Sequence, residues 1–321
     1  MNGINRLKIS QQKLLLNVNK NITNIANKNI TNNINKNIST HNLTKSNFNN
    51  INTSNSLNKA RILQNTTNSQ ISSINFNFFI KKNIDNIHIY QYTAVVIEPR
   101  KHKALEFVLN NFLENLDTRW YFIIFCSDFN YDFINEITSK LNKINQNRIQ
   151  IIRFIENNIT HKNYSELILK TNIHDYIKTE MFLIFQTDTL ILNKEKIYDF
   201  MNYDYVGAPF NRNIKWRKIY PLTDFYDVGN GGLSLRKKSK MLEILKNNKM
   251  KNENEDTYFA YYKNINKPPT IKAQEFSIES TFYDKPFGIH KIWSYLSNDE
   301  LKKLIDLYPQ IQTLIDLQGV Y

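Results

Sequence analysis

The stretch MFLIFQTDTLIL, residues 181–192, decides the fold class of this sequence. Its first five residues are all apolar, which is typical of a strand in a parallel sheet that is covered on both faces. The run then breaks at Gln186, Thr187 and Asp188 before a second apolar run begins. Because ligands of open α/β sheets collect beyond the carboxyl ends of the strands, we predict a buried strand that carries one acid, Asp188, to a functional site.

Strand and helix patterns alternate on the N-terminal side of this stretch. Apolar, β-rich runs predict three more strands, over 92–100, 119–127 and 149–155. Leucine, valine and phenylalanine recur at helical spacing between Leu105 and Leu116, and further helices are predicted over 128–141 and 164–177. This alternation predicts the α/β class, with a mostly parallel, Rossmann-like sheet flanked by helices.

The C-terminal part is less regular and richer in glycine, proline and aromatic residues. Residues 193–201 predict a short helix, 203–210 a strand, and 237–247 a helix, while a further helix starts in 253–262. Two last helices are predicted over 299–307 and 310–317. The loop Asn211–Tyr226, aromatic from Trp216 onward, is a candidate lid or else a packed surface loop.

The first 88 residues differ in composition from the rest. They carry 11 Lys or Arg and a single acid, Asp85, in a chain whose formal net charge is +13. Their Asn-rich repeats bury too little apolar surface to offset chain entropy. We predict a disordered, low-complexity tail over 1–88 and one domain over 89–321. Nucleotide bias explains the tail's composition, and weak contact with nucleic acid or an anionic surface is the alternative.

Targeting and disulfide signals are weak. No run approaches the ~20 apolar residues of a membrane span, and the segment Arg6–Val18 lacks the apolar core of a signal peptide. The expectation is a cytoplasmic protein without a membrane span, although a transit peptide stays open. The only cysteine, Cys126, lies in an apolar run and excludes an intrachain disulfide.

A series of motifs follows the opening stretch in a fixed order. FQTDTLIL is followed by YDYVGAPF, VGNGGLSLR, NEDTYF, AQEFSIE and PFGIH. Together they resemble a family of glycosyltransferase-like proteins known as a domain of unknown function, and more distantly the sugar-nucleotide transferases of the GT-A fold. The resemblance runs from about Tyr92 to Trp293 and leaves out the tail.

This resemblance implies a GT-A-like fold and a site for Mn²⁺ or Mg²⁺ with a nucleotide-sugar. GT-A enzymes hold the ion with an Asp-x-Asp motif, since hard cations suit carboxylate and phosphate oxygens. Here Gln186 stands at the first acidic position and Asp188 at the second. His290 resembles the late histidine that completes the metal shell. Glu98 and Arg100, at the end of the first predicted strand, match the place of the nucleotide, although Arg100 could equally pair with a surface acid.

Glycines and acids make up the other half of the expected site. Gly229, Gly231 and Gly232 allow a tight turn or close approach of a ligand, and Asn230 offers hydrogen bonds to a sugar. Glu255 and Asp256 resemble the acidic pair that supplies a general base, with solvated helix N-terminal acids as the alternative. Glu275 and Glu279 would share a helical face if AQEFSIES were helical.

The sequence therefore predicts a metal-assisted glycosyltransferase that moves a sugar from a nucleotide-sugar to an unidentified hydroxyl acceptor. In this prediction Gln186, Thr187, Asp188 and the glycine turn contact the donor, Asp188 and His290 bind the metal, and Asp256 rather than Glu255 is the base. The alternative is an inactive module of the same fold that binds nucleotide-sugar or carbohydrate, because Gln186 supplies no charge.

Overall fold

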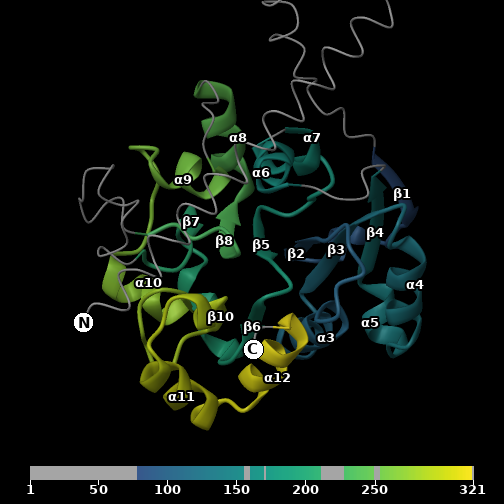
Figure 1. Ribbon diagram of the computed structural model, residues 1–321. Coiled ribbons are helices and arrows are strands. Elements are labelled where there is room, and N and C mark those ends of the chain that lie inside the picture. The colour runs from purple at the N-terminus through teal and green to yellow at the C-terminus, as the bar shows by residue number, and fades with distance from the viewer. Residues whose placement is uncertain (1–77, 155–159, 170, 211–227, 249–253, 320–321) are drawn as a thin grey trace, which may run out of the picture. The chain divides into compact units, whose positions relative to one another are not determined.

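The protein was analysed as a computed structural model, shown in Figure 1. The structure describes residues 78–154, 160–169, 171–210, 228–248 and 254–319. All of these lie in one unit, Ser72–Tyr321, and the other unit, Met1–Ile71, lies outside the described residues. The tail predicted over 1–88 thus stays a prediction for almost its whole length. The candidate lid, residues 216–226, also lies outside the described residues.

The described chain alternates strands and helices. The strands are β1 (Phe78–Lys82), β2 (Tyr92–Ile97), β3 (Trp120–Ser127), β4 (Ile149–Phe154), β5 (Met181–Phe185), β6 (Thr189–Ile191), β7 (Tyr205–Val206), β8 (Leu233–Lys237), β9 (Ser277–Ile278) and β10 (Gly288–His290). The α-helices are α3 (Leu105–Asn115), α4 (Tyr131–Ser139), α5 (Lys143–Asn147), α6 (His161–Leu169), α7 (Thr171–His174), α8 (Lys238–Asn247), α9 (Glu255–Ala260), α10 (Thr270–Phe276), α11 (Asn298–Leu307) and α12 (Gln310–Gln318). Three short 3-10 helices are η1 (Ile87–Ile89), η2 (Lys194–Phe200) and η5 (Ile292–Ser294).

A seven-stranded sheet forms the centre, in the order β1-β4-β3-β2-β5-β8-β7. Strands β4, β3, β2 and β5 are mutually parallel, whereas β1 and β8 run antiparallel to their neighbours. The chain adds β3 and β4 on one side of β2 and then returns to place β5 on the other side. This reversal is a topological switch point, where open α/β sheets bind ligands. The predicted α/β class with a mixed, largely parallel sheet is confirmed.

Two apolar layers cover the sheet, one on each face. Alternate residues of β3 point to opposite faces, as the pleat requires. Trp120 and Phe122 join the cluster packed against α3, α11 and α12, whereas Tyr121 and Ile123 join the cluster packed against α6, α8 and α9. This double burial explains why the predicted strands read as continuous apolar runs.

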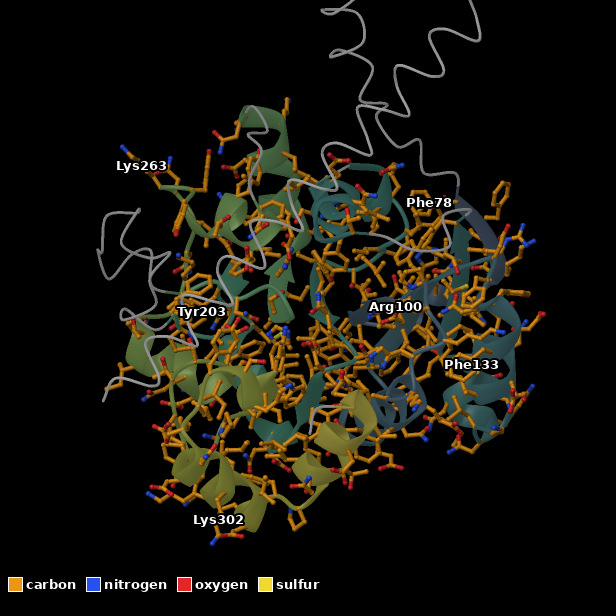
Figure 2. All side chains as sticks on the ribbon, in the orientation of Figure 1. Phe78, Arg100, Phe133, Tyr203, Lys263 and Lys302 are labelled. Atoms are coloured by element: carbon orange, nitrogen blue, oxygen red, sulfur yellow. The ribbon has the colours of Figure 1, made fainter. Side chains whose placement is uncertain are left out.

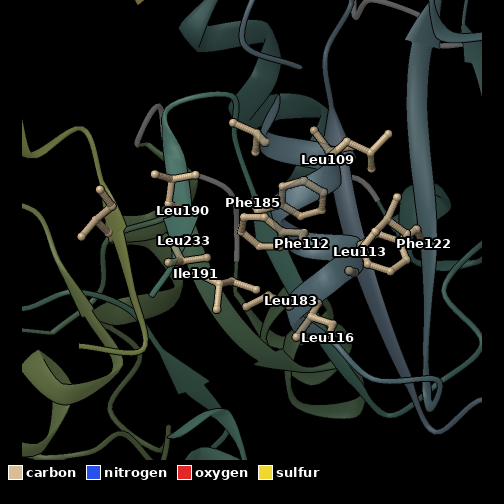
Figure 3. Packing of buried hydrophobic residues seen from close by; sticks show 14 of the residues in the cluster. Leu109, Phe112, Leu113, Leu116, Phe122, Leu183, Phe185, Leu190, Ile191 and Leu233 are labelled. Atoms are coloured by element: carbon tan, nitrogen blue, oxygen red, sulfur yellow. The ribbon is translucent and has the colours of Figure 1, made fainter. Parts of the chain in front are cut away.

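The stacking of Phe112 on Phe185 ties α3 to the strand that leads into the expected site. Their ring centroids lie 4.0 Å apart and the rings are nearly parallel, and Figure 3 shows them facing each other with Leu109 and Leu113 alongside. Both rings are fully buried. The end of β5 is therefore held by packing before the polar break begins.

The opening stretch is two strands in two different sheets rather than one strand. β5 ends at Phe185 in the central sheet, and β6 begins at Thr189 in a three-stranded sheet of order β6-β10-β9. Gln186, Thr187 and Asp188 form the crossing between the two sheets. Alternation and apolarity predict both runs, but the partner strand of the second run is almost 100 residues away in sequence, which no local pattern reveals.

Other boundaries differ from the predictions in ways that have physical reasons. Strand β1, antiparallel to β4, was missed and lies N-terminal to the predicted domain boundary; its exposed edge residues give no clear alternation. The stretch AQEFSIES is helical only as far as Phe276, and β9 follows. The condition under which Glu275 and Glu279 would share a helical face is therefore not met.

None of the helices in the described ranges is long and apolar enough to cross a bilayer.

Candidate active site

A cavity of about 510 Å³ opens at the carboxyl ends of β2 and β5. Five residues that the sequence assigned to the donor line it: Glu98, Arg100, Gln186, Thr187 and Asp188. They follow two neighbouring parallel strands, so the sheet order itself brings them together. The switch point of the sheet is therefore also the place of the largest collection of predicted site residues.

Glu98 and Arg100 form a bidentate ion pair at one wall of this cavity. Nε and Nη2 of Arg100 each donate to one carboxylate oxygen of Glu98 at 2.8 Å. Glu98 is buried, whereas the side chain of Arg100 is 56% exposed and lies near the middle of the molecule in Figure 2. Thr187 Oγ1 also donates to Glu98, at 3.4 Å. The Arg100 side chain stays more than half exposed in this pair, so a planar group or a phosphate could approach its guanidinium.

Asp188, His290 and Glu279 lie side by side at the end of the three-stranded sheet β6-β10-β9, called the small sheet below. His290 pairs with Thr189 across β10 and β6, so Asp188 lies beside it. Ile289 pairs with Ile278 across β10 and β9, so Glu279 lies on its other side. Nε2 of His290 is 3.3 Å from Oδ1 of Asp188, and Nδ1 is 3.1 Å from Oε1 of Glu279. The sequence predicted the first contact and not the second.

The two carboxylates determine the charge of the histidine. Burial lowers the pKa of His290, but Asp188 and Glu279 outweigh it and raise the pKa to about 10. Burial raises the pKa of Asp188, yet His290 overcomes this and the pKa ends below its usual value. Asp188 is thus an ionised carboxylate whose buried Oδ1 forms an ion pair with Nε2 of His290 at 3.3 Å, in a geometry that is not that of a hydrogen bond. An ionised, poorly solvated oxygen is well suited to a cation.

The glycine turn is required for close packing rather than for unusual backbone angles. Of its three glycines only Gly229 has a positive φ, of 159°. A Cβ on Gly232 would overlap the imidazole of His290 at its Nε2 end. A Cβ on Gly231 would overlap the carboxylate of Glu255 and press on Asp256. Asn230 Oδ1 accepts from the Gly232 amide at 3.0 Å and fixes the turn.

We expect Gly232→Ala to displace the His290 ring. The added methyl group has no space beside a buried ring, and overpacking of this kind costs about 1–3 kcal/mol. Thermal unfolding should show a lower midpoint, and Mn²⁺ affinity should fall together with it. Thr138→Ala on α4, which loses the buried hydrogen bond from its hydroxyl to the Ile134 carbonyl, is the control for loss of stability alone. Unchanged stability and Mn²⁺ affinity in Gly232→Ala would show that His290 does not depend on this contact.

Glu255 is part of a buried ion pair. Its Oε2 lies 2.8 Å from Nη1 of Arg236, and both side chains are almost completely buried. Arg236 also donates from Nε to Ser234 at 2.9 Å and lies over the rings of Tyr205 and Phe259. Burial lowers the pKa of Arg236, but the negative charge of Glu255 raises it by more than burial lowers it. The net pKa is above the usual value, and Arg236 stays charged. The pair joins β8 to α9.

We expect Glu255→Gln to damage the fold more than the chemistry. Removing one partner leaves the Arg236 charge buried and unpaired, which costs about 3–5 kcal/mol. Urea unfolding should show this loss. The control is Glu243→Gln, which removes a half-exposed partner of Lys240 and should cost less than about 1 kcal/mol. A stability loss that is equally small at Glu255 would mean that the buried pair does not hold α9 in place.

Asp256 differs from its neighbour. Its Oδ1 accepts from the Thr257 amide at 2.7 Å, and no cationic side chain is paired with it among the described residues. Burial, followed by the negative charge of Glu255, raises the pKa of Asp256 to about 7. Gly231 faces Asp256 while the adjacent Gly232 faces His290. Asp256 is thus the predicted acid whose proton can move near neutral pH. It does not line the cavity, and the glycine turn connects it to His290, because Gly231 contacts one and Gly232 the other.

Sequence reasoning missed several residues that line the cavity. These are Thr160, Tyr164, His102, Lys291, Trp293 and Gln318. Lys291 and Trp293 follow His290 closely, so their proximity to that motif could have identified them. Lys291 also adopts a left-handed backbone, with φ of 47°, which is uncommon outside glycine. Gln318, from the last helix, donates to the Thr187 carbonyl at 2.6 Å, and no sequence pattern indicates this contact.

A comparison with protein families finds a match for part of the chain. Residues 148–290 match the model of the family described as "Protein of unknown function (DUF5672)". The family resemblance that the motifs predicted is thereby confirmed, over a shorter segment than Tyr92–Trp293. The match ends at His290 and includes Asp188, the glycine turn and Asp256. No curated protein matches the chain.

Among the solved structures whose backbone follows a similar path are three glycosyltransferases. The galactosyltransferase LgtC, solved with donor and acceptor sugar analogues, has a TM-score of 0.44 and 11% identity, covering 71% of this chain and 95% of its own. The mannosyltransferase PcManGT of Pyrobaculum calidifontis, solved with GDP-Man and Mn²⁺, has a TM-score of 0.41 and 9% identity, covering 67% and 64%. The glycosyltransferase GlyE of Streptococcus pneumoniae has 0.42 and 9%, covering 70% and 62%. The donor and the metal named with these structures are those of the neighbours.

Proposed function

Starting from the match of residues 148–290 to this family of unknown function, we propose that the domain is a metal-assisted glycosyltransferase. It would move a sugar from a nucleotide-sugar to the hydroxyl group of an acceptor. The observation that carries the proposal is the pair formed by Asp188 and His290, 3.3 Å apart, at the edge of a cavity that five predicted donor residues line.

The residues present fit a small divalent cation. Ligands of one Mg²⁺ or Mn²⁺ lie ~2.1 Å from the ion, so two at a right angle are about 3 Å apart. The separation of Asp188 Oδ1 and His290 Nε2 is close to this value, and Oδ1 has no hydrogen-bond partner. In the described part of the chain, no three His, Cys, Asp or Glu side chains form a metal site by themselves. Diphosphate oxygens and water would supply the remaining ligands.

The bound cation would neutralise the departing diphosphate, and the chain's own residues would do the rest. Asp188 and His290 would hold it against the donor. Arg100, fixed by Glu98, would contact the nucleotide. Asp256 would take the proton of the acceptor hydroxyl while the new carbon–oxygen bond forms and the sugar–phosphate bond breaks. The products are a glycoside, a nucleoside diphosphate and a protonated Asp256, which returns its proton to water.

The alternative is a module that binds nucleotide-sugar without turnover. The observation that favours it is Gln186, which lines the cavity where a second carboxylate would strengthen metal binding. Weaker neutralisation of the diphosphate would leave the cavity able to bind and unable to release a product. Calorimetry with a nucleotide-sugar would then show binding in a protein that consumes no donor. Location in the cytoplasm and contact of the tail with nucleic acid stay predictions from the sequence.

A donor screen tests the proposal. The full chain is incubated with UDP-sugars and GDP-sugars, with Mn²⁺ or with a chelator, and release of nucleoside diphosphate is measured. We expect at least one donor to be consumed with Mn²⁺ and none with the chelator. Failure of every donor would reject the enzyme, and binding without release would favour the module. Release that is unaffected by the chelator would reject the role of the metal.

A further inference from the structure

We propose that Glu279 is a positioning residue for the metal ligand His290. It would accept the Nδ1 proton of the imidazole, so that the lone pair of Nε2 points toward the cation beside Asp188. This inference deepens the proposed function and rests on it. The comparisons assign no role to Glu279, and it lines no part of the cavity.

The small sheet carries this inference, because it fixes the three side chains from the backbone. β10 lies between β6 and β9, antiparallel to one and parallel to the other. Asp188 immediately precedes β6, His290 ends β10, and Glu279 immediately follows β9. The hydrogen-bond register therefore places one acid on each side of the histidine.

Each nitrogen of the imidazole contacts a different carboxylate. Nδ1 lies 3.1 Å from Oε1 of Glu279, and Nε2 lies 3.3 Å from Oδ1 of Asp188. The metal-free ring carries a proton on both nitrogens, and a cation that binds at Nε2 would displace the proton there into water. The ring then keeps one proton, on Nδ1, where the neighbouring acceptor holds it. An acceptor at Nδ1 selects the form whose Nε2 carries the lone pair. A carboxylate behind a metal-bound histidine has this effect in many sites.

Burial makes the positioning effective. Glu279 and His290 are each 7% exposed, so water does not compete strongly for either group. Gly232 lies against the Nε2 end of the ring, where a Cβ would overlap Nε2. Because glycine has no side chain, it leaves space for a ligand at Nε2, while Glu279 contacts Nδ1. The backbone of Ser277 and Gly288, paired across the two strands, keeps the carboxylate at this distance.

The experiment measures Mn²⁺ binding to the full chain without any donor, by the loss of the free Mn²⁺ signal in electron paramagnetic resonance. We expect Glu279→Ala to weaken Mn²⁺ binding about 10–100-fold, as loss of such partners does elsewhere. Glu279→Gln should keep most of the affinity, because its amide oxygen can still accept from Nδ1. Equal losses in both variants would overturn the proposal, since the effect would then come from charge alone.

A double-mutant cycle separates positioning from general damage. If Glu279 acts through His290, adding Glu279→Ala to His290→Ala should change Mn²⁺ affinity no further. Additive losses would overturn the proposal. If His290→Ala alone leaves Mn²⁺ affinity unchanged, the metal site of the proposed function fails; if only Glu279→Ala is without effect, positioning fails and the metal site stands.

A control variant on α10 tests whether the loss of any nearby carboxylate would weaken Mn²⁺ binding. Glu275→Ala removes the partner of Lys272, 2.8 Å away on α10, and should bind Mn²⁺ as the unchanged protein does. Thermal unfolding of every variant confirms that the fold persists. Should Glu279→Ala fail to fold, Glu279→Leu and Glu279→Gln replace it, and a matching Mn²⁺ affinity in these two variants would overturn the proposal.

Discussion

Asp188→Asn should lower kcat/KM for release of nucleoside diphosphate by roughly 10²–10³-fold. The substitution keeps the shape of the side chain and removes the only ionised oxygen that the polar break offers. A metal ion supplies several kcal/mol of charge stabilisation, and each factor of ten in rate corresponds to about 1.36 kcal/mol. The measurement is the donor assay at saturating and at limiting Mn²⁺. At limiting Mn²⁺ the loss should be larger, because the uncharged amide would also bind the ion more weakly.

The matched control is Asp306→Asn, which changes an exposed acid on α11 and should leave the rate unchanged. Thermal unfolding should show that Asp188→Asn is folded, because position 188 lies outside both sheets. A variant that turns over donor at the original rate, with the original dependence on Mn²⁺, would remove Asp188 from the mechanism. Loss of activity without change in Mn²⁺ dependence would assign Asp188 to the donor instead.

Asp256→Asn should lower kcat by about 10²–10⁴-fold, the usual contribution of a general base. The unchanged enzyme should gain activity as pH rises and level off above pH 7, because the pKa of Asp256 is raised to about 7 and only the ionised form accepts a proton. The residual activity of the variant should lack this rise. A pH profile of kcat/KM from about pH 5 to 9 measures both effects.

The same substitution should stabilise the protein at high pH. Below pH about 3.8 Asp256 is protonated in the folded and unfolded chain and contributes nothing. As pH rises toward 7 the unfolded chain loses this proton first, so folding is disfavoured, and the cost is complete above pH 7. Asp256→Asn should therefore gain about 1–3 kcal/mol in urea unfolding at about pH 8 and nothing near pH 3.5.

The exposed control Asp306→Asn should show neither the kinetic nor the thermodynamic effect. Full activity together with an unchanged ascending limb in Asp256→Asn would show that another group is the base. A stability gain without a loss of activity would show that Asp256 is a strained buried acid and no participant in the reaction.

The sequence predicts those parts of the fold that local patterns encode. The apolar runs of β2, β3, β4 and β5 and the helical spacing of α3 depend on neighbours within a few residues. The small sheet could not be predicted from local patterns, because β6 pairs with β10, which lies far away in the sequence. Strands of two or three residues carry too little pattern to be recognised.

In the candidate site, too, the sequence predicted some contacts and missed those that depend on tertiary packing. Asp188 and His290 were paired through the resemblance, and their 3.3 Å contact agrees with that pairing. The ion pair between Glu255 and Arg236 was not predicted, because a salt bridge between β8 and α9 depends on tertiary packing. Glu279 would have lain on a helical face only if AQEFSIES were helical throughout, and it follows a strand instead. In each case the missing information was which distant backbone lies alongside.

The crossing between the two sheets has a further consequence for how this domain can change. Gln186, Thr187 and Asp188 belong to neither hydrogen-bond ladder, and their carbonyls are bound by Thr189, Gln318 and Lys291. The backbone of the crossing is thus held by contacts that do not involve its own side chains. Residue 186 is therefore a position where a single exchange alters the charge offered to a ligand at little cost to folding. One substitution at residue 186 would therefore change the charge that the proposed metal site offers and leave both sheets as they are.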